Sequence, residues 1–180
     1  DTYVMKNELF LKLIRGAQKA SSIYTLADVM NAGNDQLDIR CIQHKGYFAA
    51  ICDFMSYFQA NMDLLDIDTA KSLFQPDWSI YTQTTDSCPT KYVEGASVKN
   101  SMIANGCVIE GTVENSVIGR GVKIKKGAVI KNCLILGHTE IDNDVHLEYQ
   151  VVDKWAKIVH LKEIIATPDK PGYIKRDDVI

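Results

Sequence analysis

The chain has 180 residues, of which 46% are hydrophobic and 24% charged, and its formal net charge is −3. This length holds one large domain or two small ones, and the composition is that of an ordinary globular protein. The acidic balance gives no support to nucleic-acid binding, which normally requires a basic surface. No apolar run reaches the roughly 20 residues that a membrane span needs. We therefore expect neither a nucleic-acid partner nor a membrane.

The cysteines indicate a reducing compartment. There are five, without close paired spacing: Cys41, Cys52, Cys88, Cys107 and Cys133. An odd number argues against a secreted disulfide framework, and no signal peptide is visible. We expect a cytoplasmic protein, and the first residue, Asp1, suggests a fragment of a longer chain.

Residues 1–75 mix helical and strand patterns. Asn7 and Thr25 are suitable caps for two short helices, the second of which is expected to run through Asn31 and close at Gly33. Alternation over residues 39–44 predicts a strand, and residues 47–51 predict a second one.

A third helix is expected to begin at Asp53. Its apolar face contains Phe54, Tyr57, Phe58, Met62 and Leu65. Asp68 is a candidate cap for a last short turn that ends at Phe74, and an extended linker follows Pro76. Since no Gly-rich phosphate loop precedes any of these helices, residues 1–75 are interpreted as an incomplete α/β domain.

Residues 98–151 carry an apolar repeat whose spacing fits neither a helix nor a simple strand. Apolar residues return every four to six positions, whereas a helix would return them every three or four and a strand every two. The steps begin at Val98, Ile103, Ile109, Val113, Ile118, Ile124, Ile130, Ile135, Ile141 and Leu147. This spacing is typical of hexapeptide repeats, in which three strand-and-turn units make one coil of a parallel β-helix.

One phrase occurs three times in this repeat, at residues 98–103, 113–118 and 130–135, and its third residue is always asparagine. Asparagine tolerates left-handed backbone conformations, so we expect Asn100, Asn115 and Asn132 to stack at a corner of the coil. The repeat holds about three coils, and residues 152–180 are expected to add a degenerate coil and a cap. The predicted organisation is a mainly β chain with the incomplete domain at 1–75, a linker at 76–91 and a β-helix at 92–180.

Three stretches resemble the ADP-glucose pyrophosphorylases (glucose-1-phosphate adenylyltransferases). Residues 46–65, which begin Gly-Tyr-Phe-Ala-Ala and end Ala-Asn-Met-Asp-Leu-Leu, are similar to that family's Gly-Tyr-Trp-(Arg/Lys)-Asp-Val-Gly-Thr…Ala-Asn-Met-Asp-Leu-Leu segment. Residues 78–81, Trp-Ser-Ile-Tyr, and the Glu-Gly motifs at 94–95 and 110–111 resemble the stretches that lead into its β-helix. The resemblance implies a left-handed β-helix.

The chain departs from the family at the reaction site. Where catalytic members have Arg or Lys followed by the Asp that holds Mg²⁺, this chain has Ala49 and Ala50. Alanine offers no oxygen to a cation that requires oxygen ligands, so we expect no metal site, no catalytic residue and no cofactor in this chain. The family's sugar-phosphate loop, Ser-Ser-His-Asp-Phe-Gly, has become Ser-Ser-Ile-Tyr-Thr-Leu; the resemblance leaves Ser21, Ser22 and Tyr47 as substrate-binding candidates.

The pattern resembles the non-catalytic second subunit of the Gram-positive enzymes. It implies a hetero-oligomer, expected to be a tetramer, with a catalytic subunit that makes ADP-glucose from ATP and glucose-1-phosphate for glycogen synthesis. A phosphorylated-sugar effector is a further implied partner; Lys6, Arg40, Lys45 and Arg120 are basic candidates for its site, although they are also explained as solvated side chains.

Three alternatives stay open. A hexapeptide acyltransferase would use a histidine as general base, for which His138 and His146 are candidates. An active nucleotidyltransferase of the same family would need Asp53 or Asp63 as a metal ligand, although Asp53 is more simply a helix cap. A purely structural scaffold would assemble with its partner without altering it.

Overall fold

The computed structural model describes residues 2–17, 25–82 and 84–180 and divides into two compact units, Asp1–Lys45 and Gly46–Ile180. The domain boundaries expected from the sequence stay a prediction.

The first unit contains the two expected helices. They are α1 (Asn7–Ala17) and α2 (Leu26–Ala32), and a 3₁₀ turn, η1 (Asn34–Gln36), follows. Thr25 caps α2, since its hydroxyl accepts the Asp28 N–H at 3.2 Å while the Asp28 carboxylate accepts the Thr25 N–H at 2.9 Å. The strand predicted over residues 39–44 is wrong, because these residues pair with no other strand in the described part of the chain.

The second unit begins with helices. These are α3 (Phe54–Met62), η2 (Asp63–Leu65) and α4 (Ile67–Leu73). Asp53 caps α3 as expected, but α4 is capped by Asp66, whose Oδ1 accepts the Thr69 N–H at 2.8 Å, rather than by Asp68. The strand predicted over residues 47–51 is also wrong, so the described residues ahead of residue 91 contain helices and no strand.

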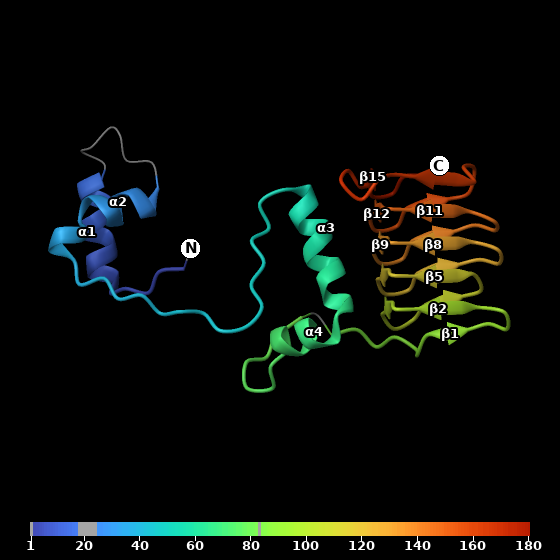
Figure 1. Ribbon diagram of the computed structural model, residues 1–180, viewed down its shortest axis with the longest axis horizontal. Coiled ribbons are helices and arrows are strands. Elements are labelled where there is room, and N and C mark those ends of the chain that lie inside the picture. The colour runs from blue at the N-terminus through green and yellow to red at the C-terminus, as the bar shows by residue number, and fades with distance from the viewer. Residues whose placement is uncertain (1, 18–24, 83) are drawn as a thin grey trace. The chain divides into compact units, whose positions relative to one another are not determined.

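Residues 91–174 form a parallel β-solenoid, as the repeat predicts, with three five-stranded sheets (Figure 1). The first sheet contains β1 (Lys91–Tyr92), β4 (Val108–Ile109), β7 (Lys123–Ile124), β10 (Glu140–Ile141) and β13 (Lys157–Ile158). The second contains β2 (Ser97–Lys99), β5 (Thr112–Glu114), β8 (Val129–Lys131), β11 (His146–Glu148) and β14 (Glu163–Ile165). The third contains β3 (Met102–Ile103), β6 (Val117–Ile118), β9 (Leu134–Ile135), β12 (Gln150–Val152) and β15 (Gly172–Ile174). The strands β13, β14 and β15 form the additional coil that was expected after the three coils of the repeat.

The predicted apolar steps form the core. From Ile109 to Leu147 they are at most 1% exposed, whereas Val98 and Ile103 in the first coil are only partly buried. Equivalent residues stack in register, as in the column Ile109, Ile124, Ile141 and Ile158. Complete burial of an aliphatic side chain contributes roughly 1.5–3 kcal/mol, so this stack is the main source of stability in the solenoid.

The asparagine corner is confirmed. Asn100, Asn115 and Asn132 have φ of 40°, 45° and 51°, and the Asn100 amide donates to Asn115 Oδ1 at 2.7 Å. In the next coil Tyr149 takes the equivalent place with φ of 51°. These residues turn the chain from the second sheet into the third.

A column of polar side chains closes this corner from inside. Ser116 Oγ donates to the Glu114 carbonyl of its own coil at 2.7 Å and accepts the Cys133 N–H of the next coil at 3.0 Å. Cys133 repeats the pattern: its Sγ donates to the Lys131 carbonyl at 3.0 Å and accepts the Gln150 N–H at 3.4 Å. Each buried amide at the turn therefore finds its acceptor in the preceding coil.

The left-handed corner predicts the outcome of a substitution at Asn132. Asn132→Ala should lower the free energy of unfolding by about 1 kcal/mol, because an alanine pays the steric cost of positive φ, whereas Asn132→Gly should change it little. Urea unfolding of the two variants measures the difference. Equal losses in both would show that the asparagine side chain, and not its backbone conformation, stabilises the corner.

The core position of Cys133 predicts its reactivity. Burial raises the pKa of its thiol to about 12, so it stays protonated and unreactive. Cys107 is buried as well, while Cys41, Cys52 and Cys88 are exposed. Titration of the native protein with a thiol reagent should label the exposed cysteines rapidly and the buried pair only after unfolding; rapid labelling of all of them would contradict this assignment.

Candidate functional site

Residues 46–65 form the segment that the resemblance associates with the family's reaction site. The segment leads into α3, whose cap is a reciprocal box: Asp53 Oδ1 accepts the Ser56 N–H at 2.7 Å, and Ser56 Oγ accepts the Asp53 N–H at 3.0 Å. The Ser56 N–H and the Ser56 hydroxyl, which also donates to Asp53 Oδ1 at 2.7 Å, hold the pKa of Asp53 below its usual range. Asp53 therefore begins a helix, as predicted.

Tyr47 and Asp63 lie together although they are far apart in sequence. The Tyr47 hydroxyl donates to Asp63 Oδ2 at 2.8 Å, and Gln59 Nε2 donates to Asp63 Oδ1 at 2.7 Å. Burial, reinforced by the hydrogen bond to the Asp63 carboxylate, raises the pKa of Tyr47. Both Asp63 oxygens are engaged within the protein, a contact for which the sequence carried no signal.

The position that the resemblance associates with the family's Mg²⁺ carries no oxygen ligand in this chain, and the absence of a metal site stays a prediction. Ala49 is partly exposed and Ala50 is exposed, and both bring methyl groups to the position where the resemblance implies a basic residue and the metal ligand. The two acidic candidates are used elsewhere, Asp53 in a helix cap and Asp63 in the contact with Tyr47 and Gln59. In the described part of the chain, no group of three or more His, Cys, Asp or Glu side chains is placed to hold a metal ion.

Of the three substrate-binding candidates, one lies within the described residues and two lie outside them. Tyr47 is described, and its hydroxyl is bound to Asp63. Ser21 and Ser22 lie outside the described residues. The substrate-binding role of all three stays a prediction.

The outer face of the third sheet is apolar and supports α3. Its outward residues Val117, Leu134 and Val151 are in register and pack against Phe58, which is 4% exposed. Tyr57 and Met62 of the helix add to this cluster. In sequence this face is marked by paired apolar residues, such as Val117-Ile118 and Leu134-Ile135, of which one points inward and one outward.

The histidines considered as acyltransferase bases occupy surface corners and strands. His138, with φ of 63°, is exposed and stacks on Trp155 with ring centroids 4.1 Å apart. His146 lies on β11, where its Nδ1 is 3.7 Å from Glu163 Oε1. A general base must reach a substrate proton, and a role of either histidine as such a base stays a prediction.

The basic residues considered for an effector make local contacts. Arg40 pairs with Asp38 at 2.8 Å in the first unit, and Arg120 Nη1 donates to Thr85 Oγ1 at 3.3 Å in the second. A role of Lys6, Arg40, Lys45 and Arg120 in binding a phosphorylated sugar stays a prediction.

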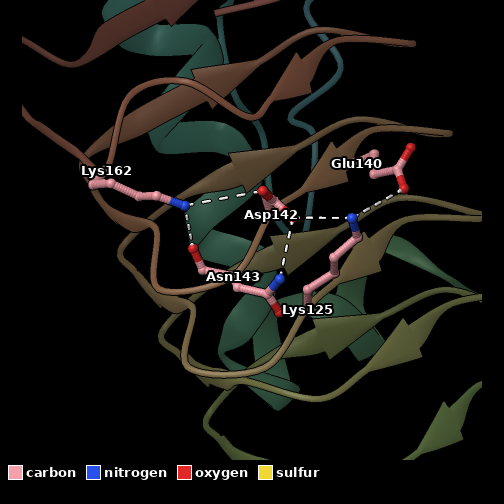
Figure 2. A network of polar contacts seen from close by, with 5 residues as sticks. All are labelled: Lys125, Glu140, Asp142, Asn143 and Lys162. Atoms are coloured by element: carbon pink, nitrogen blue, oxygen red, sulfur yellow. Dashed lines mark hydrogen bonds and ion pairs between the residues drawn. The ribbon is translucent and has the colours of Figure 1, made fainter.

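A charged network that the sequence did not indicate ties neighbouring coils together (Figure 2). Lys125 Nζ contacts Asp142 Oδ1 at 2.9 Å and Glu140 Oε1 at 3.8 Å. Lys162 Nζ lies 3.9 Å from Asp142 Oδ2 and donates to the Asn143 carbonyl at 2.6 Å. The hydrogen bond between Lys125 and Asp142 raises the pKa of Lys125 and lowers the pKa of Asp142. Because carboxylates neutralise these lysines, the network stabilises a corner and offers little free positive charge to an anion.

Comparison with known proteins identifies relatives that match most of the chain. Residues 88–170 match the family model described as GlmU-like, C-terminal hexapeptide. The chain is 34% identical over 174 residues, 97% of its length, to the glycogen biosynthesis protein GlgD of Bacillus subtilis (strain 168), and 42% identical over 130 residues, 72% of its length, to GlgD of Geobacillus stearothermophilus. It is 29% identical over 130 residues, 71% of its length, to a glucose-1-phosphate adenylyltransferase of Corynebacterium jeikeium (strain K411). The matches cover 50%, 38% and 32% of these relatives, so the chain spans half of their length or less.

In the described residues no helix has the length and apolar character needed to span a bilayer.

The Asp53 cap predicts a pH dependence of stability. Because the pKa of Asp53 is lowered in the folded state, its contribution is complete above the unfolded pKa of about 3.9 and is lost as the pH falls through the folded value. Between about pH 6 and about pH 3, the urea midpoint should therefore fall more for the wild type than for Asp53→Asn, which keeps an uncharged cap. Asp77→Asn, in the linker, is the control; an equal fall in Asp53→Asn and wild type would contradict the assignment.

Proposed function

The chain is a homologue of the glycogen biosynthesis protein GlgD and of glucose-1-phosphate adenylyltransferases, and we propose that it belongs to a regulatory, catalytically impaired subunit of the latter enzyme. The observation that carries this proposal is the pair Ala49 and Ala50, at the position where the family has its basic residue and metal-binding aspartate. Nucleotidyl transfer requires a cation to neutralise the charge that develops on the phosphoryl group. The residues around this position do not replace the missing ligand, since Asp53 and Asp63 are engaged in other contacts.

The proposed partner is the catalytic subunit, which would make ADP-glucose from ATP and glucose-1-phosphate with its own Mg²⁺. Assembly into a hetero-oligomer, a tetramer in this proposal, is supported by the first coil of the solenoid. There β1, β2 and β3 end the three sheets, and Tyr92 and Met102 are 55% and 39% exposed. An unpaired sheet edge with apolar neighbours favours association.

The subunit would change the rate of its partner and its response to a phosphorylated-sugar effector. Such a change is a coupling free energy, typically about 1–3 kcal/mol between sites. The proposal places the protein in the cytoplasm, and the exposed free thiols Cys41, Cys52 and Cys88 are in keeping with a reducing compartment.

The test measures ADP-glucose formation by the full-length protein alone, by a catalytic relative alone, and by the two co-purified. We expect negligible synthesis by the protein alone with Mg²⁺, and altered kinetics in the mixture. The matched control is the catalytic relative with its aspartate at the position of Ala50 replaced by alanine, which should lose activity. A rate for the protein alone comparable with that of the relative would overturn the proposal in favour of an active nucleotidyltransferase.

A purely structural scaffold makes a different prediction for the same experiment. The two proteins would then co-purify, but the kcat, KM and effector response of the catalytic subunit would be unchanged. Assembly is followed by size-exclusion chromatography, so a missing complex and an inert complex are distinguished.

A further inference from the structure

Helix α3 contacts two regions of the second unit that belong to different parts of the proposed subunit. One is the outer face of the solenoid's third sheet, and the other is the segment 46–53, which contains Ala49 and Ala50. Figure 1 shows α3 alongside the solenoid, on the side of β9, β12 and β15.

The contact with the solenoid extends over several coils. Phe58 is buried among Leu134 and Val151, on β9 and β12 respectively, and Val117 of β6 adds to the same cluster. At the start of the helix, Phe54 packs edge-on against Tyr173 of β15 with centroids 5.8 Å apart. Tyr173 is in turn fixed by its hydroxyl, which donates to Asp153 Oδ2 at 2.9 Å. The helix therefore contacts residues from four successive strands of the third sheet, β6, β9, β12 and β15.

The segment 46–53 is attached to the same helix at both ends. Near its beginning, the Tyr47 hydroxyl donates to Asp63, directly after the last residue of α3. Near its end, the Cys52 N–H donates to Ser56 Oγ at 3.0 Å, in the first turn of α3. The segment forms no strand in the described residues, and these side-chain contacts attach it to α3 and the residue after it. Ala49 and Ala50 lie between the two attachment points.

We infer that α3 is the positioning element that couples the solenoid to the segment of Ala49 and Ala50, with Phe58 as its anchor on the solenoid and the Tyr47–Asp63 hydrogen bond as its anchor on the segment. This inference rests on the proposed function, because it states how binding of the partner at the solenoid would reach the degenerate reaction site. Packed side chains and hydrogen bonds can carry coupling between two regions, and α3 with its C-cap Asp63 contacts both of them.

The first test probes the attachment itself and does not depend on any activity. Phe48 is 75% exposed, and chymotrypsin should cleave after it faster when the segment is released from α3, because a released chain adapts more easily to the protease. In the full-length protein, Tyr47→Phe should raise the cleavage rate at the Phe48–Ala49 bond about tenfold, and mass spectrometry follows the cleavage. Loss of one hydrogen bond worth about 1.4 kcal/mol corresponds to this factor. Tyr81→Phe, at a tyrosine that is 94% exposed, is the matched control and should have no effect. Equal rates for Tyr47→Phe and wild type would overturn the inference.

The second test uses the complex with the catalytic subunit. Tyr47→Phe should assemble normally but lose most of the change in its partner's kcat/KM, and Phe58→Ala should lose it as well. Full modulation by Tyr47→Phe in an intact complex would overturn the inference and leave the proposed function standing. Absence of modulation by the wild type would overturn the proposed function instead, while the cleavage test still decides the attachment. Since Phe58→Ala also removes buried surface, Tyr47→Phe, which deletes a single oxygen, is the decisive variant.

Discussion

The second unit depends on the parallel hydrogen bonds between successive coils. Its strands have only two or three residues, so none can be stable by itself. Each coil instead donates its N–H groups to the carbonyls of a neighbour, as Lys123 does to Thr139 at 2.9 Å. Aliphatic residues on the axis stack in the same register, so pairing of the backbone and burial of the core are one process. The corners follow from this constraint, because the chain must turn there without leaving an amide unpaired.

The three faces of the solenoid differ in what they can bind. The first and second sheets carry outward charges of alternating sign, such as Lys99, Glu114 and Lys131, in which the carboxylate lies 3.5 Å and 3.9 Å from the two ammonium groups. Such pairs contribute little stability, but they keep these faces hydrated. The third sheet is apolar outside, and α3 covers it with Phe58. The difference between faces explains why the helix occupies this side.

The segment around Ala49 and Ala50 is attached to the neighbouring helices by side-chain hydrogen bonds. Tyr47, Asp63 and Gln59 form one network, and Asp53 and Ser56 form another. The segment around Ala50, where the resemblance implies a lost metal ligand, therefore keeps defined contacts with α3 and η2. A subunit that keeps this architecture while it lacks the ligand is suited to influence a partner rather than to catalyse, which is the rationale for the regulatory function proposed above.

The sequence alone determined the solenoid, its core, its asparagine corner and the cap of α3, because each depends on local spacing and on residue types with strong conformational preferences. It also carried the family resemblance and the substitution at Ala50. Only the tertiary structure decided that residues 39–44 and 47–51 are not strands, since alternation specifies a pleat but cannot supply a partner. It alone brought Tyr47 to Asp63 and Phe58 to Leu134, because contacts between residues distant in the chain follow from how whole elements pack and leave no periodic signal in the sequence.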